Sequence, residues 1–311
     1  MDSLKETNLL KFNKDTLLSV RKVYDLDKPG RIDDAINIIE EWVKKQDHFT
    51  VKNFPRDYLE RKIILCKGSV ERVKKQLDKT CTLRTLLPAF YESINFKTDY
   101  KDSNIILDAI LPKLTEDNYR VYLVKFMGKK NETGFTNYYR FAVTLIEYAF
   151  RYDYFIGAIV IIDYTDTNIL DIIKNLDLVQ LRQFFILLID SYGVKIKNIH
   201  IISPSKAVET VLTIFKQVVT AKIAERIQAH KDVKTLYKFV SKSILPIELG
   251  GQEKSIKELH EQWVDAVSST EFQELYSKIK EAKTKEEYRK IYQNENEYMG
   301  ISGTFRTLSV D

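Results

Sequence analysis

Apolar residues recur every three or four positions through the first hundred residues, a spacing typical of amphipathic helices. Residues 31–45 and 69–86 each place their apolar side chains on one helical face. The Pro29-Gly30 pair and Pro88 interrupt helix continuation and separate these helices from their neighbours. The pattern therefore predicts a small helical domain over residues 1–97.

After about residue 100 the pattern changes to short apolar runs that alternate with amphipathic segments. Run 156–163 has no polar face, which is typical of a central strand covered on both sides. This alternation favours an α/β domain over residues 98–265, with a mostly parallel sheet and crossover helices, and then a charged, partly helical extension over 266–311. The expected strands are 121–127, 156–163, 196–202 and a short one near Ile227, and the expected helices are 136–152, 168–190 (one or two helices) and 205–219.

Composition places the chain among soluble globular proteins, since 44% of its 311 residues are hydrophobic and 30% are charged. The longest apolar run, 155–162, is much shorter than a membrane span. The N-terminal residues lack the basic and apolar regions of a secretory signal, and the chain has two cysteines, Cys66 and Cys81. We therefore expect a cytoplasmic protein that needs no disulfide.

Positive charge is concentrated in two segments. Residues 52–84 carry ten Lys or Arg and four acidic residues, and residues 191–242 carry ten and three, although the net charge of the whole chain is only +5. This asymmetry suggests a basic surface for phosphate groups, either of nucleic acid or of anionic lipid. The alternative is that lysine-rich helices only solvate their outer faces.

The sequence contains no familiar catalytic motif: no Gly-x-Ser-x-Gly elbow, no Gly-rich phosphate loop and no His-Glu-x-x-His. The four histidines are dispersed, and His200 within a predicted strand is more typical of a core residue than of a ligand. Asp163 and Asp166 follow the central strand, where α/β proteins place catalytic or metal groups, but no third ligand or base accompanies them. We therefore predict no catalytic residue, no metal and no cofactor.

The helices of the second domain carry more apolar residues than one buried stripe requires. In segment 205–219, Val208, Val211, Phe215 and Val219 share one side of a helix because they are three or four residues apart. One explanation is a large aromatic core. The other is an apolar cavity that this helix closes. The helix would then carry a wide apolar stripe because both of its faces sometimes contact lipid.

The segment Leu245-Pro-Ile-Glu-Leu-Gly-Gly-Gln, followed by Ser255-Ile-Lys-Glu-Leu-His and Trp263, resembles the end of a CRAL-TRIO domain. The closing Gly303-Thr-Phe-Arg-Thr-Leu-Ser-Val-Asp is similar to the C-terminus of insect members. Four further segments resemble parts of the same family, namely 66–88, Ile159-Val-Ile-Ile-Asp, Ile199-His-Ile-Ile-Ser-Pro and Lys222-Ile-Ala-Glu-Arg-Ile-Gln-Ala-His. Within the family the chain resembles the alpha-tocopherol transfer protein-like and cellular retinaldehyde-binding protein-like members.

The resemblance implies a CRAL-TRIO lipid-binding domain with an apolar cavity, behind a helical N-terminal domain. It implies a non-enzymatic cytoplasmic carrier, transiently peripheral to membranes, which encloses one retinoid, tocopherol, carotenoid or similar lipid and exchanges it at phosphoinositide-containing membranes. The cavity walls that it implies are Tyr139, Ala142, Ile146, Ile162, Phe184, Leu187, Leu188 and Tyr192, with Val208, Val211, Phe215 and Val219 on the inner face of the gate helix. The phosphoinositide-binding residues that it implies are Lys75, Lys195, Lys197, Lys222 and Arg226, all in the two basic segments.

Other functions remain open at this stage. An adaptor of the same fold would keep the basic surface and a vestigial cavity. Nucleic-acid binding would explain the basic segments but not the apolar gate helix. The partners that we expect are a hydrophobic ligand and an anionic membrane, and we expect the protein to be a monomer. Two departures from the family pattern stand out: Lys62-Ile-Ile-Leu replaces Phe-Leu-Arg, and Lys216-Gln-Val-Val replaces Lys-Pro-Phe-Leu. Without that proline, the gate helix is expected to continue straight through.

Overall fold

A five-stranded sheet forms the centre of the protein. The computed structural model describes residues 4–100, 105–128 and 134–289. The strands follow one another across the sheet in chain order, and β2 to β5 are parallel whereas β1 runs antiparallel to β2. The prediction of a mostly parallel sheet with 156–163 at its centre is confirmed, but the sequence pattern missed β1. The strands are β1 (Ile106–Ile110), β2 (Tyr119–Phe126), β3 (Gly157–Asp163), β4 (Ile196–Ile202) and β5 (Ile227–His230).

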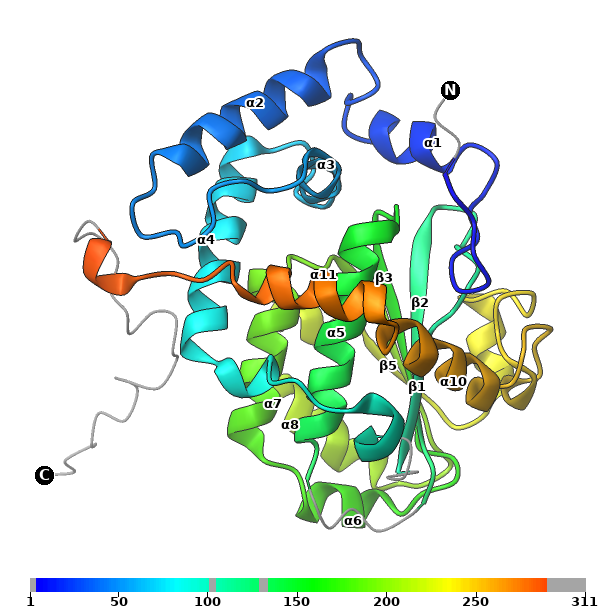
Figure 1. Cartoon of the computed structure of the whole chain (residues 1–311). Coiled ribbons are helices and arrows are strands. Elements are labelled where there is room, and N and C mark those ends of the chain that lie inside the picture. The colour runs from blue at the N-terminus through cyan, green and yellow to red at the C-terminus, as the bar shows by residue number, and fades with distance from the viewer. Residues whose placement is uncertain (1–3, 101–104, 129–133, 290–311) are drawn as a thin grey trace, which may run out of the picture.

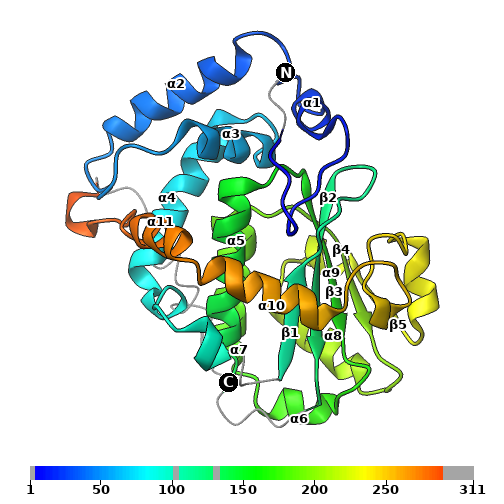
Figure 2. The same ribbon diagram turned by 45° about the vertical axis from the view of Figure 1, so that its right-hand side comes forward.

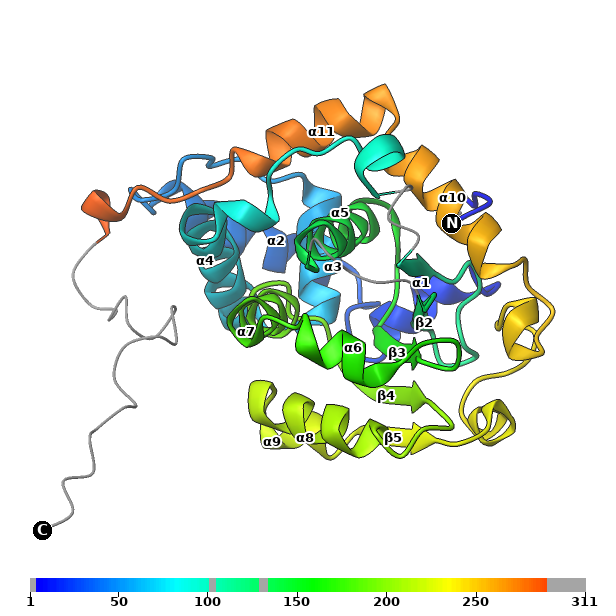
Figure 3. The ribbon, with the colours of Figure 1, turned by 90° about the horizontal axis from the view of Figure 1, so that it is seen from below.

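Helices α5 (Thr136–Tyr152), α7 (Leu178–Phe185) and α8 (Val208–Val218) lie on one face of the sheet (Figure 3). The predicted segment 168–190 contains α6 (Ile169–Lys174), α7 and a π-helical turn (Ile186–Ser191). It divides because Asn168 and Asp177 cap the two helices, each side chain accepting hydrogen bonds from backbone N–H groups of the first turn.

The gate helix is shorter than expected. It begins at Val208, three residues after the predicted start, and it ends at Val218. The prediction that it continues straight through is wrong, because Val219 and Thr220 are extended and Thr220 precedes a new short helix, α9 (Ala221–Ala224). The helix therefore ends without the family's proline.

The N-terminal helices are α1 (Thr16–Lys22), α2 (Arg31–Lys44), α3 (Arg56–Leu65) and α4 (Val70–Leu86). Three of them, α2 to α4, stack beyond α5, away from the sheet, whereas α1 lies at the end of the sheet, where Thr16 donates to Asn118 just before β2 (Figure 1). Two of them confirm the predicted helices 31–45 and 69–86. Short 3₁₀ and π turns complete the helical segments at Pro88–Phe90, Phe96–Tyr100, Val233–Lys238, Ile247–Leu249 and Glu286–Tyr288.

Two C-terminal helices cross the outside of this assembly, α10 (Ile256–Val267) and α11 (Thr270–Lys280) (Figure 2). Trp263, one of the residues that carry the family resemblance, is fully buried and donates from its indole Nε1 to the carbonyl of Ile110 at 2.8 Å. This bond fixes α10 against β1. The resemblance in 303–311 lies outside the described residues.

Candidate ligand cavity and basic surface

An apolar cavity of about 100 Å³ lies between the sheet and helices α5 to α8. A second cavity of about 80 Å³ lies beside it, between the sheet and α5. The two cavities share five walls, Tyr122, Val160, Phe184, Leu188 and Ile196. The apolar space predicted between the gate helix and the sheet therefore corresponds to the first cavity, and the second adjoins it beneath α5.

The central strand shows that this space is open rather than tightly packed. Residues of β3 alternate between full burial and half-burial although the strand has neighbours on both sides. Val160 and Ile162 are half-buried and line the cavity, whereas Ile159 and Ile161 on the opposite face are fully buried. A period of two residues assigns them to opposite faces of the sheet. The exposed area on the cavity face thus arises from an internal space.

Eight of the twelve predicted cavity residues line one or both cavities: Tyr139, Ala142, Ile146, Ile162, Phe184, Leu188, Val211 and Phe215. The other four do not. Leu187 and Tyr192 are completely buried, and Tyr192 is bonded through its hydroxyl to Glu147. Val208 is the first residue of α8, and Val219 follows its last residue, so both lie at the ends of the gate.

Sequence reasoning missed several aromatic walls. Tyr122 and Phe126 on β2 and Phe135 and Tyr138 at the start of α5 line the larger cavity. The two β2 residues are four apart with Val124 between them, which also lines the cavity. Period-two alternation could have placed this stripe on the cavity side, because the strand itself was predicted.

The gate helix packs on other helices more than on the sheet, since α8 contacts α6, α7 and α9. The rings of Phe185 and Phe215 meet edge to face, with centroids 5.8 Å apart. Leu212 and Val218 are half-buried on the outer part of the helix. A helix held mainly by contacts to three short helices can be displaced without breaking the sheet.

Five cations form a cluster at the end of the sheet where β4 and β5 begin. The pKa of Lys67 is lowered, first by partial burial and then by the positive charges of Lys195, Arg72, Lys222 and Arg226. Across the described residues none of the five forms an ion pair with a carboxylate. We call these five residues the basic cluster.

Docking of α4 on the turn before β4 builds the cluster from two distant segments. Thr80 of α4 donates to the carbonyl of Ser191 at 2.9 Å, and Lys79 pairs with Asp190 at 3.1 Å. Gly193 has φ +70°, and a Cβ there would meet the Gln76 side chain of α4 at 1.9 Å. Glycine at this turn therefore permits the close approach that brings Arg72 near Lys195.

Two predicted phosphoinositide residues have other surroundings. Lys75 lines a hollow with Trp42, Asp78 and Arg289, on a different side of α4. Lys197 pairs with Asp117 and lies 4.5 Å from the centroid of the Tyr119 ring. Of the predicted set, Lys195, Lys222 and Arg226 lie in the basic cluster. Lys67 and Arg72 were missed because their relation to them depends on tertiary docking.

The acidic pair after the central strand is an ion cluster. Lys125 contacts Asp163 at 2.9 Å and Asp166 at 2.6 Å, with the Asp163 carboxylate buried. Within the described residues no group of three or more His, Cys, Asp and Glu is arranged to hold a metal. His200 is fully buried and shares a 2.9 Å hydrogen bond with His230, so it occupies a core position.

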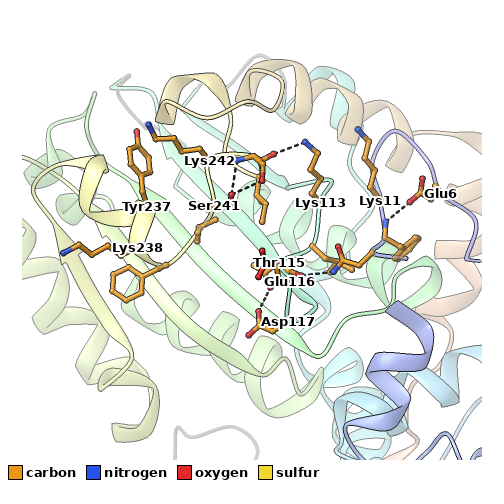
Figure 4. Close-up of a pocket in the computed structure, with 17 residues that line it drawn as sticks. Glu6, Lys11, Lys113, Thr115, Glu116, Asp117, Tyr237, Lys238, Ser241 and Lys242 are labelled. Carbon is orange, nitrogen blue, oxygen red and sulfur yellow. Dashed lines mark hydrogen bonds between the residues drawn. The ribbon is translucent and has the colours of Figure 1, made fainter. Parts of the chain in front are cut away.

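A large surface groove lies at the edge of the domain, between the N-terminal segment and residues 237–244 (Figure 4). Its volume is about 940 Å³, and four lysines and three acidic residues are among the residues that line it. Lys113 spans one wall, donating to the carbonyl of Ser243 at 2.9 Å and pairing with Glu253 at 3.4 Å. The groove is polar and open, so it differs in kind from the predicted apolar cavity.

Comparisons with known proteins address the fold. Residues 109–251 match the family model of the CRAL/TRIO domain. The crystal structure of Sfh5 is similar, with a TM-score of 0.48 and 13% identity over 75% of this chain and 92% of that one. No curated protein matches the chain. None of the helices in the described part of the chain combines the length and apolar character that a bilayer span requires. Because the matched residues include β2 to β5 and the helices around the cavity, this part of the chain is a CRAL/TRIO domain.

Proposed function

We propose that the protein is a non-enzymatic carrier that encloses one small hydrophobic molecule and exchanges it at anionic, phosphoinositide-containing membranes. The ligand class is a retinoid, tocopherol, carotenoid or lipid of similar size. The observation that carries the proposal is the apolar space beneath α8, lined by half-buried side chains such as Val160 and Leu188. These side chains have apolar surface left to cover, and a ligand would cover it.

The cavities at about 100 and 80 Å³ are smaller than the roughly 300–1,000 Å³ of typical ligand sites. Ligand entry therefore requires α8 to move outward and the shared walls to separate so that the two spaces join. This small volume is also what favours the alternative, an adaptor of the same fold that uses the basic cluster alone and binds no ligand.

The basic cluster supplies the membrane contact in this proposal. Each cation near an anionic surface contributes roughly 1 kcal/mol, so five contribute roughly 5 kcal/mol before losses. The carboxyl end of α8 lies at the same end of the sheet as the basic cluster. This is because α8 follows the last residue of β4 and returns toward the first residue of β5. A membrane held there would meet the gate and replace water at its apolar face.

Native mass spectrometry of the purified full chain separates carrier from adaptor. A stoichiometric lipid that solvent extraction releases supports the carrier, and a chain that neither retains nor takes up retinol or tocopherol supports the adaptor. The membrane step is tested by co-sedimentation with vesicles of phosphatidylcholine containing phosphatidylinositol bisphosphate. Replacing Lys195, Lys222 and Arg226 with alanine should weaken this binding and slow transfer, without changing ligand affinity in solution.

A matched control removes the same charge at the opposite end of β5. Lys231, Lys234 and Lys238 are exposed and follow this strand, so their replacement with alanine should leave vesicle binding nearly unchanged. Equal loss in the two triple variants would indicate a response to net charge alone and would contradict docking through the basic cluster.

A further inference from the structure

A separate pocket of about 350 Å³ lies between the segment that leads into α3, helix α5 and helix α11. It shares no lining residue with the two apolar cavities. Of its lining residues, only Glu147 and Arg151 fall within the residues that match the family domain. The helical N-terminal part and the C-terminal extension thus build a space that is independent of the proposed lipid cavity.

The walls of this pocket are apolar and flat. Phe54 and Tyr58 form a stacked pair, with ring centroids 5.9 Å apart and planes at 19°. Leu275 and Ile279, four residues apart on α11, form another part of the wall. All four side chains remain half-buried although α3 and α11 both pack on α5. The neighbouring elements therefore leave apolar surface uncovered, and a planar apolar group would cover it.

The floor of the pocket is an ion pair with unused hydrogen-bonding capacity. Arg84 and Glu147 are nearly fully buried, at 2% and 1% side-chain exposure, and Arg84 Nη2 lies 2.5 Å from Glu147 Oε1. The Tyr192 hydroxyl donates to the same Oε1. Across the described residues, Arg84 Nε and Glu147 Oε2 have no partner. Buried charged groups normally have their hydrogen-bonding atoms satisfied, so these two atoms point to a missing polar group.

The two free atoms define the chemistry of that group. Nε–H is a donor and Oε2 is an acceptor, and the two atoms belong to side chains that one hydrogen bond already joins. A hydroxyl can accept from Nε and donate to Oε2 at once. A carboxylate would be repelled by the Glu147 carboxylate, and a hydrocarbon would leave both atoms unpaired. Neither atom is exposed to water in this structure, so a hydroxyl reaches them only when the floor side chains turn toward the pocket, and it then gains hydrogen bonds without displacing water.

We propose that this pocket binds a small, flat, apolar molecule with a single hydroxyl group, an aromatic or alicyclic alcohol. Its ring system lies against the Phe54–Tyr58 pair and the α11 wall, and its hydroxyl lies at the Arg84–Glu147 floor. The site is distinct from the cavity of the proposed carrier function and does not depend on that function.

The full-length chain can be titrated with 2-naphthol, naphthalene and 2-naphthoate by isothermal calorimetry. We expect 2-naphthol to bind about tenfold more tightly than either analogue, the factor expected for one net hydrogen bond. Equal affinities for 2-naphthol and naphthalene, or the absence of saturable 2-naphthol binding, would overturn the proposal. The second result would show that the two polar atoms take no ligand from this pocket.

Variants locate the binding. Leu275→Trp fills the pocket and should weaken 2-naphthol binding at least tenfold, and Ile279→Phe serves the same purpose if the first variant melts early. Ser277→Trp places the same ring on the exposed side of α11 and should leave binding unchanged. Val211→Trp fills the apolar cavity instead. Loss of binding in Val211→Trp but not in Leu275→Trp would place the ligand in the lipid cavity and contradict the proposal.

Discussion

The two faces of α5 line two different kinds of cavity. Toward the sheet, Ala142 and Ile146 border an apolar space with almost no polar group at its walls. Toward α11, one residue further along, Glu147 forms the floor of the second pocket with Arg84. One helix thus separates a space suited to any apolar chain from one that demands a polar group at a fixed place. The comparison shows that size and apolar walls alone do not define specificity; buried polar atoms do.

The largest expected effect tests the charged face of α5. Arg84→Met leaves the Glu147 carboxylate buried without a counter-charge, so we expect the free energy of unfolding to fall by about 3–5 kcal/mol. Arg56→Met is the control, because Arg56 pairs with Asp33 and Glu40 at the surface and should contribute about 1 kcal/mol or less. Urea denaturation of both variants measures the difference. Similar small losses in the two would show that the Arg84 pair is solvated and the pocket floor is not dry.

The next effect tests the apolar face through two neighbouring residues of β3. Ile161→Ala removes a fully buried side chain and should cost about 2–5 kcal/mol of unfolding free energy. Ile162→Ala removes a half-buried side chain that borders an existing space, so its cost should be at most half as large. Thermal or urea unfolding of the ligand-free chain decides. Equal costs would mean that the cavity is filled by packing and would remove the structural basis for a carrier.

A smaller effect concerns Lys62, which lies between the smaller apolar cavity and the pocket with the Arg84–Glu147 floor. Lys62 is fully buried. Its Nζ lies 4.4 Å from the ring centroid of Phe150, which lines the smaller apolar cavity. The same atom lies 5.9 Å from the ring centroid of Tyr58, which lines the pocket with the Arg84–Glu147 floor. Burial lowers the pKa of Lys62 to about 8. Unlike an arginine, this lysine can lose its proton near neutral pH.

The sign of the pH dependence follows from proton binding. The unfolded chain holds a proton on Lys62 up to about pH 10.5, whereas the folded chain begins to lose it near pH 8. Between these values the unfolded state binds more protons, so stability rises with pH. From pH 7 to pH 9 the free energy of unfolding of the natural chain should rise by roughly 1 kcal/mol relative to Lys62→Met. A constant difference between the two proteins would show that Lys62 keeps its proton throughout.

The sequence pattern predicted the sheet and its helices because most elements carry long apolar runs of one period. It missed β1, whose centre holds the fully buried Asp108. That carboxylate accepts hydrogen bonds from the hydroxyls of Tyr100 and Tyr122, at 2.7 and 2.5 Å, which lie 8 and 14 residues away in the sequence. A buried charge inside a strand breaks the apolar pattern, and only the fold reveals its partners.

The candidate sites were also predictable to different degrees, because local spacing is visible in the sequence whereas contacts between distant residues are not. Cavity walls on α5 and α8 follow from helical spacing, because one face of each helix must point inward. The floor of the second pocket joins Arg84 and Glu147, 63 residues apart, and no local pattern pairs them. The basic segments were visible in the charge count, but which lysines face one another depends on how α4 docks.

The smallest predicted effect tests that docking with two cations of α4. Arg72 and Lys75 are both exposed and only three residues apart, yet Arg72 lies in the basic cluster whereas Lys75 lines the hollow beside Trp42. Arg72→Ala should weaken binding to phosphoinositide vesicles about fivefold at low salt, which corresponds to roughly 1 kcal/mol for one cation at the membrane. Lys75→Ala, with the same loss of charge, should change binding much less, because its charge lies farther from the docked surface and is screened.

Raising the salt concentration should reduce the difference between the variants as the Debye length shortens. If both substitutions weaken binding equally at low salt, the membrane contacts α4 broadly, as the family resemblance implied for Lys75. If only Arg72→Ala weakens it, the contact is confined to the cluster beside the gate, where a docked bilayer also meets the carboxyl end of α8.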